Sequence, residues 1–126
     1  MIEALFNQPG YLGAKRMLDA TVARHDAITT NIGNSETPRY RRVDLLPSFR
    51  TELESAIAGQ DSTRLRSLRP QIGTDLQALP VNRDGNTVNL ERELLELSQN
   101  TVANTVETRM VTGALAKLRQ AITGKS

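Results

Sequence analysis

The sequence predicts an all-α fold, in which long N-terminal and C-terminal amphipathic helices pair as a coiled-coil-like bundle beside an irregular, partly mobile middle segment. Residues 17–32 and 90–122 both place apolar residues at alternating three- and four-residue steps, the spacing of an amphipathic helix. The only aromatic residues are two Phe and two Tyr, so aliphatic helix faces must supply most of the buried area. These observations favour one domain over residues 1–126 that assembles with neighbours. A self-sufficient helical bundle is the alternative.

The first helix is predicted over residues 11–32. Leu18, His25 and Ile32 recur at seven-residue spacing, so they share one face of this helix. His25 is the only histidine and the chain has no cysteine, so we expect a packed or hydrogen-bonded structural residue rather than a metal ligand. Gly33 has low helix propensity and is expected to mark the end of the helix.

The middle segment, residues 33–86, is predicted to be irregular. Proline and glycine interrupt it, and each of these residues disfavours a continuing helix: Pro38, Pro47, Gly59, Pro70, Gly73, Pro80 and Gly85. Residues 60–83 contain few apolar side chains and several turn formers, so we expect this stretch to be the most mobile.

One short helix is predicted inside the middle segment, near residues 48–58. Phe49, Leu53 and Ile57 follow one another at four-residue steps and therefore share a face. Ser48 is expected to cap its first turn, and Gly59 is expected to stop it.

The second long helix is predicted over residues 88–123. The run Asp84-Gly85-Asn86 is typical of a tight turn, because Gly and Asn adopt positive φ at low cost. Asn89 or Thr87 is expected to cap the helix that follows.

Two rows of residues run along this helix. The first keeps a heptad-like register and consists of Leu90, Leu94, Leu97, Thr101, Asn104, Thr108, Val111, Leu115, Leu118 and Ile122. Val102, Val106 and Met110 form a second row, so either the buried face rotates or two neighbours bury two faces. The acidic pairs Glu91/Glu93 and Glu93/Glu96 are interpreted as solvated helix charges.

Catalysis has little support in this sequence. There is no cysteine and one histidine, so a Cys–His pair, a thiolate metal site or a disulfide is excluded. No glycine-rich phosphate loop or nucleophile elbow occurs. The sequence therefore predicts a protein that is not an enzyme, with no cofactor and no metal.

Charge and hydropathy leave one alternative class of partner. The net charge is +2, and a cluster of arginines in the middle third could contact phosphates: Arg39, Arg41, Arg42, Arg50, Arg64, Arg66 and Arg69. Acidic residues lie among them and no nucleic-acid motif is present, so we expect no nucleic acid, with a small basic nucleic-acid-binding protein as the alternative function. No apolar run approaches the roughly 20 residues of a membrane span, so no transmembrane segment is expected.

The most specific local sequence is RHDAITTNIGNSETPRYRR over residues 24–42, with Asp44 shortly after it. It resembles the N-terminal signature of flagellar basal-body rod and hook proteins, in which an amphipathic helix ends in Asn-Ile-Ala-Asn, followed by Thr-Pro-Gly-Tyr and a basic residue. The details are most similar to the proximal rod subunit of B type. One departure is Arg39, which stands where the family usually has Gly; if that position needs positive φ, the turn must differ or be strained.

The run DGNTVNLERE over residues 84–93, followed by Leu97 and Asn100, is similar to the C-terminal signature of the same subunit. The two motifs occur in the right order on the two predicted helices. The resemblance implies a structural subunit of the bacterial flagellar proximal rod, assembling through its terminal helices into the tubular drive shaft needed for flagellum-dependent motility.

The resemblance also implies partners and a location. The expected partners are further copies of this chain, other flagellar rod subunits, the adaptor at the rod base and the export gate. The expected location is the basal-body rod where it crosses the periplasm. Residues 1–10 do not look like a cleavable signal peptide, so we expect export through the flagellar type III apparatus.

The candidate subunit-interface residues share a position on the helix seams or in the two motifs. They are Leu18, Val22, His25, Ile28, Asn31, Ile32, Asn34, Thr37, Pro38, Tyr40, Arg41, Arg42, Asp44, Leu90, Leu94, Leu97, Val111, Leu115, Leu118 and Ile122. For Tyr40, Arg41, Arg42 and Asp44 the alternative is an ordinary surface turn.

Overall fold

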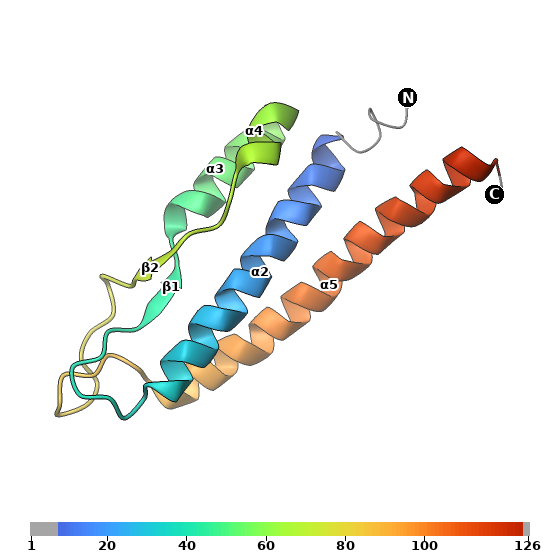
Figure 1. Ribbon diagram of the computed structural model, residues 1–126. Coiled ribbons are helices and arrows are strands. Elements are labelled where there is room, and N and C mark those ends of the chain that lie inside the picture. The colour runs from blue at the N-terminus through green and yellow to red at the C-terminus, as the bar shows by residue number, and fades with distance from the viewer. Residues whose placement is uncertain (1–7, 125–126) are drawn as a thin grey trace.

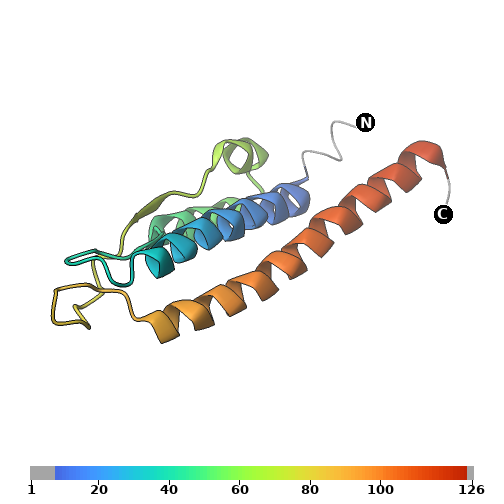
Figure 2. The same cartoon turned by 60° about the horizontal axis from the view of Figure 1, so that its bottom comes forward.

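The computed structural model describes residues 8–124 and is dominated by two long helices that run side by side (Figure 1). In chain order the elements are α2 (Pro9–Gly33), β1 (Val43–Leu45), α3 (Pro47–Ala58), α4 (Ser62–Ser67), β2 (Ile72–Thr74) and α5 (Leu90–Thr123). Helices α3 and α4 lie against α2, while α5 continues past the first residues of α2 as a long arm (Figure 2). The prediction of a mainly helical chain is confirmed, but the all-α class is not strictly correct because β1 and β2 form a small sheet.

Helix α2 follows the prediction for residues 11–32 closely. It begins at Pro9, which suits the first helical position because its missing N–H would have no partner there. It ends at Gly33, as its low helix propensity suggested.

Helix α5 also follows the prediction for residues 88–123, with Asn89 as its N-cap. The Asn89 side chain accepts a hydrogen bond from the Arg92 backbone N–H at 3.2 Å. The predicted turn before it is confirmed, because Gly85 has φ of 80°. Gly124, with φ of 68°, closes the other end of the helix.

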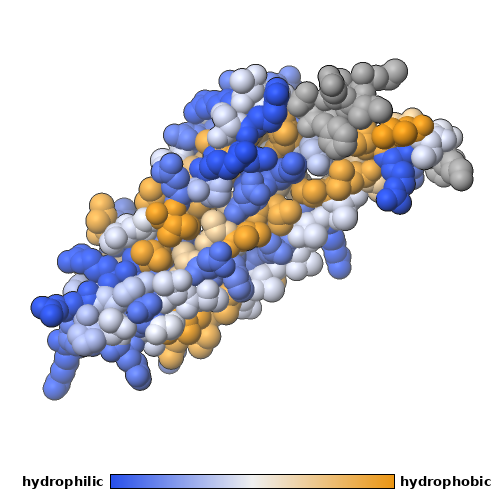
Figure 3. Space-filling view, in the orientation of Figure 1, coloured by the Kyte–Doolittle hydropathy of each residue, from blue (hydrophilic) through white to orange (hydrophobic). Residues whose placement is uncertain are grey.

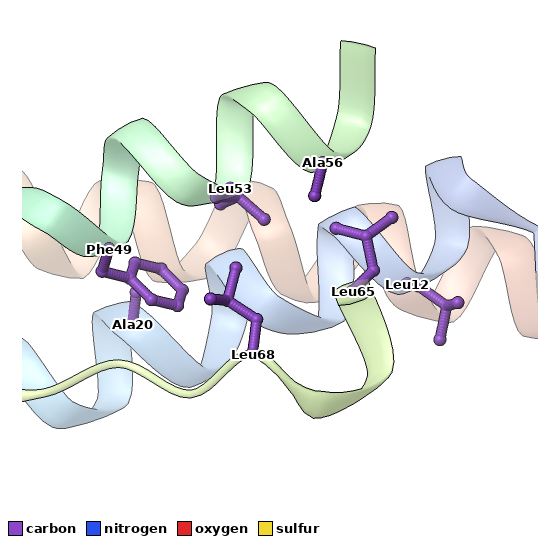
Figure 4. Packing of buried hydrophobic residues seen from close by; sticks show 7 residues of the cluster. All are labelled: Leu12, Ala20, Phe49, Leu53, Ala56, Leu65 and Leu68. Atoms are coloured by element: carbon purple, nitrogen blue, oxygen red, sulfur yellow. The ribbon is translucent and has the colours of Figure 1, made fainter. Parts of the chain in front are cut away.

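The hydrophobic core lies between α2, α3 and α4 (Figure 4). It consists of Leu12, Ala20, Phe49, Leu53, Ala56, Leu65 and Leu68. This core gives the middle segment a fixed place, since Leu65 is fully buried in α4 and Leu68 follows directly after that helix.

The middle segment is more regular than the sequence predicted. Residues 60–83 contain α4 and β2, and β2 pairs antiparallel with β1 so that Val43 faces Thr74 and Leu45 faces Ile72. The strands were missed because three residues are too few to show an alternating pattern. The short helix near 48–58 is confirmed as α3.

Helix α3 begins differently from the prediction. Its N-cap is Leu46, which offers no capping side chain, and Pro47 occupies the first turn. The predicted cap at Ser48 is therefore wrong, since this residue already lies inside the helix. Phe49 and Leu53 are buried as expected, while Ile57 keeps an exposed edge.

The face that α5 turns toward α2 is polar, which corrects the predicted seam. The residues of α5 that are buried are Glu93, Asn100, Glu107 and Leu118. The predicted apolar row lies beside this face, and Leu90, Leu94, Leu115 and Ile122 are 45%, 51%, 40% and 56% exposed. Only Leu118 of that row is buried, while Leu97 and Val111 are half-buried. Hydrogen bonds across the helix pair explain the polar face: the Asn100 amide donates to the Thr21 backbone carbonyl at 2.8 Å.

Arg39 has φ of 59°, in the left-handed region that favours glycine, so the departure from the family pattern at this position has a structural cost. Its N–H donates to the Asp84 carbonyl at 3.0 Å, which holds the turn in place. We expect Arg39→Gly to raise the free energy of unfolding by about 1 kcal/mol, because glycine removes the left-handed strain. Urea unfolding of both proteins measures this change, and Arg39→Asn should give a smaller gain. Equal or lower stability in Arg39→Gly would contradict the strain argument.

Among residues 8–124, no helix has the length and apolar character needed to cross a membrane.

Candidate functional site

The two sequence motifs meet in space at the end where α2 stops and α5 starts. Asn86, from the second motif, is completely buried and its side-chain amide donates to three carbonyls of the first motif: Asn34 at 2.9 Å, Ser35 at 3.2 Å and Thr37 at 2.7 Å. Its own oxygen accepts from the Val88 N–H at 2.7 Å. One amide therefore fixes the loop after α2 against the chain that enters α5.

Asn31 ties the last turns of α2 to the same place. Its amide donates to the Val43 carbonyl at 2.8 Å and to the Glu93 carboxylate at 3.3 Å. Its oxygen accepts from the Val43 N–H at 2.9 Å and from the Tyr40 hydroxyl at 3.1 Å. The buried amide has partners on both sides, which explains why a polar residue can occupy this position at no solvent exposure.

Arg42 is the centre of a buried ion cluster. Its Nε lies 2.6 Å from Glu93 Oε1, its Nη1 lies 2.6 Å from Asp75 Oδ2, and its Nη2 lies 3.2 Å from Asp44 Oδ2. The side chains of Arg42 and Glu93 are 7% and 1% exposed. Burial works to lower the pKa of Arg42, but the hydrogen bond and charge of Glu93, then Asp75 and Asp44, raise it above its ordinary value. The guanidinium thus stays charged and connects β1, the segment after β2 and α5.

Arg24 extends the cluster along α2. Its Nε lies 3.0 Å from Asp44 Oδ1, and its Nη2 forms a second ion pair with Glu96 of α5. Burial works to raise the pKa of Asp44, but the hydrogen bond from Arg24, the Leu45 N–H and the charges of Arg24 and Arg42 lower it. Two arginines and four carboxylates together hold α2, β1 and α5 in a fixed arrangement.

The lowered pKa of Asp44 makes part of the stability sensitive to acid. A carboxyl with a depressed folded-state pKa contributes stability above its ordinary value, and this contribution is lost as pH falls through the folded-state pKa. We expect Asp44→Asn to unfold with about 1–3 kcal/mol less free energy than the parent at pH 7, and with a smaller difference at low pH. Urea unfolding of Asp44→Asn and the parent, at pH 7 and at low pH, measures this difference. The matched control is Asp26→Asn, on the exposed face of α2. If the difference in unfolding free energy between Asp44→Asn and the parent does not become smaller at low pH, the lowered pKa of Asp44 is contradicted.

The predicted interface residues divide into three groups by burial. Ile28, Asn31, Arg42 and Leu118 are buried inside the subunit, so their side chains hold the fold itself. Half-buried members are Leu18, Ile32, Asn34, Tyr40, Asp44, Leu97 and Val111. Exposed members are Val22, His25, Thr37, Pro38, Arg41, Leu90, Leu94, Leu115 and Ile122. His25 was expected to be packed or hydrogen-bonded, but its side chain is exposed and borders a shallow hollow between α2 and α5 beside Asn100, Thr101 and Asn104.

Several residues of the cluster were missed by sequence reasoning. Glu93 was interpreted as a solvated helix charge and is instead 1% exposed at the side chain. No contact within the subunit was predicted from the sequence for Asp75 or for the side-chain amide of Asn86. The one signal that could have indicated Glu93 is its spacing, since Glu93, Asn100 and Glu107 recur every seven residues and so share a face.

The second feature of the site is the apolar surface that α5 leaves uncovered. We call the exposed members of the predicted seam, Leu90, Leu94, Leu115 and Ile122, the outer row. Val102, Val106 and Met110 form the second exposed row, at 62%, 52% and 51%. Hydrophobic groups appear over both ends of α5 in Figure 3. Rows of this kind on a long helix are typical of a surface that packs against another protein.

Flagellar rod proteins from two bacteria are similar to this chain over most of its length. No protein-family profile matches the chain. The "Flagellar basal body rod protein FlgB" of Aquifex aeolicus is 27% identical over 114 residues, covering 89% of this chain and 91% of that protein. The protein of the same name from Buchnera aphidicola is 28% identical over 101 residues, covering 70% of this chain and 74% of its own. Both matches support the FlgB family of flagellar basal body rod proteins.

The stretch of this chain that matches the Aquifex aeolicus protein spans both motifs. A match over 89% of a chain of 126 residues cannot leave out either motif, wherever it begins. The two motifs that the sequence resemblance used are therefore the same two segments that meet around Asn86 and Arg42.

Proposed function

We propose that the chain is a structural subunit of the bacterial flagellar basal-body rod, of the proximal type. It assembles into the tubular drive shaft through its terminal helices. Its partners are other copies of itself, other rod subunits, the adaptor at the rod base and the export gate. It acts in the basal body where the rod crosses the periplasm, and its role is mechanical rather than catalytic.

One observation carries the proposal. Helix α5 contacts α2 through a polar face and leaves its outer row uncovered, so the apolar residues of a long helix remain available to neighbours. The similarity to FlgB rod proteins supports the proposal that these neighbours are other rod subunits. The buried cluster supports the same role, because ion pairs and amide hydrogen bonds keep α2 and α5 in a fixed relation for a repeating contact.

The alternative of nucleic-acid binding loses part of its basis in the structure. Arg42 is buried and paired with three carboxylates, and Arg69 donates to the Arg66 and Leu68 carbonyls at 2.7 and 2.8 Å. These arginines are engaged within the subunit rather than aligned on one exposed face.

A strain lacking this chain tests the proposed function. We expect it to stop swimming and its purified basal bodies to end at the membrane ring without a rod, as seen by electron microscopy. Restoring the parent chain on a plasmid should bring back both the rod and swimming. Complete rods in the deletion strain would overturn the proposal, and a salt titration of DNA and RNA binding would then test the alternative.

A further inference from the structure

A groove lies on the side of the molecule where α3 and α5 flank α2. Its volume is about 430 Å³, and its apolar lining comes from Met17, Leu45, Phe49, Leu53 and Ile57. Part of this lining belongs to the core cluster, where Phe49 and Leu53 of α3 point toward α2 (Figure 4). Phe49 and Leu53 are 4% and 6% exposed, so the apolar surface that the groove offers to a neighbour comes mainly from the partly exposed Met17, Leu45 and Ile57.

Glu107 of α5 lies in the same groove and is 9% exposed. Its Oε2 has no hydrogen-bond partner within residues 8–124, and no cation among those residues forms an ion pair with it. Burial raises the pKa of this carboxyl, and a hydrogen bond from Thr21 acts in the opposite direction. Arg24 and Arg50 also line the groove, but neither forms an ion pair with Glu107. This buried carboxylate is therefore left without a cationic partner within residues 8–124, which is costly.

A different face of α5 from the one that carries Glu107 has a surface that complements the groove. Leu115, Arg119 and Ile122 are all exposed and follow one another at four- and three-residue steps, so they share one face. Arg119 forms no ion pair in the part of the chain that the structure describes. It is a cation between two aliphatic side chains, and it complements a carboxylate beside an apolar surface.

This surface cannot fill the groove of its own molecule. Gln99, Ala103 and Glu107 are the α5 residues that border the groove at four-residue steps, and Leu115 and Arg119 lie on another face of the same continuous helix. The two surfaces can therefore meet only between two copies.

We propose that the groove receives α5 of a second copy, with Leu115 and Ile122 on the apolar lining and the Arg119 guanidinium on Glu107. The contact joins two different surfaces of the same chain, and such a heterologous contact repeats without closing unless its rotation makes a ring. Repeated along an axis, it builds an open helical array. The inference rests on the proposed rod function and names one contact between successive subunits.

Cysteine cross-linking tests this contact, because the natural sequence has no cysteine. Ile57→Cys places a thiol at the rim of the groove, and Leu115→Cys places one on the proposed occupant. We expect a mixture of the two purified variants to give a cross-linked heterodimer with a short bismaleimide. The matched control pairs Ile57→Cys with Val102→Cys, which is more exposed but lies outside the contact. Equal yields from the two mixtures would overturn the proposal.

Sedimentation of the purified full chain tests the charged pair. We expect Glu107→Gln and Arg119→Gln each to weaken self-association by about 10- to 100-fold, the range for a hydrogen bond to a charged group. The double variant should be little weaker than either single variant, since both remove the same interaction. Additive losses, or a parent chain that stays monomeric at high concentration, would overturn the assignment.

These results separate the contact from the rod function itself. If the deletion strain lacks rods but the cross-link fails, the rod function stands and the groove assignment is wrong. If the cross-link forms and deletion strains build complete rods, the contact between copies stands and the rod function is wrong.

Discussion

Arg42→Ala is expected to lower the free energy of unfolding by about 3–5 kcal/mol, because it leaves a buried carboxylate without its cation. Glu93 is 1% exposed at the side chain and lies 2.6 Å from the Arg42 Nε, so water cannot replace the guanidinium without opening the cluster. Asp75 and Asp44 lose a partner in the same substitution. Urea unfolding followed by circular dichroism measures the change.

The matched control is the neighbouring residue. Arg41 is exposed, so Arg41→Ala should change the unfolding free energy by less than about 0.5 kcal/mol. The two substitutions remove the same side chain one residue apart, and they differ only in burial and partners. Similar small effects from both would show that the ion cluster does not hold the subunit together.

Leu94→Asp is expected to prevent incorporation into rods while the subunit still folds and is expressed. The side chain is 51% exposed and belongs to the outer row, so its loss leaves the core of the subunit intact. A carboxylate at a position covered by an apolar neighbour would be desolvated at a cost of several kcal/mol. Swimming assays and the rod content of purified basal bodies measure the effect, and Leu115→Asp should behave alike.

Leu79→Asp supplies the control for this substitution. Leu79 is 77% exposed in the segment between β2 and α5 and is not part of the outer row. A strain with Leu79→Asp should therefore swim, provided that the circular dichroism spectra of both variants match the parent. Normal rods in the Leu94→Asp strain would remove the outer row from the assembly surface.

The two long helices could be predicted because their signals are local. Apolar spacing set their extent, and Gly85 and Asn89 marked the start of α5 through a positive φ and a capping oxygen. The face of α3 that carries Phe49 and Leu53 was found for the same reason. Each of these features depends on residues within one or two turns of each other.

The contact between α2 and α5 could not be predicted in this way. An apolar row is expected to face the partner helix, but here Asn100 and Glu93 occupy that face because their polar atoms find partners at long range. Arg41 and Arg42 are identical in the sequence, and only the position of Glu93, far along the chain, decides which one is buried. The role of the Asn86 amide likewise depends on three carbonyls of a distant loop.

The most direct test of the central claim is cryo-electron microscopy of purified basal bodies that contain this chain. We expect its α5 to be found in the rod wall, with Leu94 and Leu115 covered by a neighbouring subunit and with Arg42 still buried against Glu93. A rod that contains no copy of the chain would contradict the account. A rod in which the outer row of α5 faces solvent would contradict it as well.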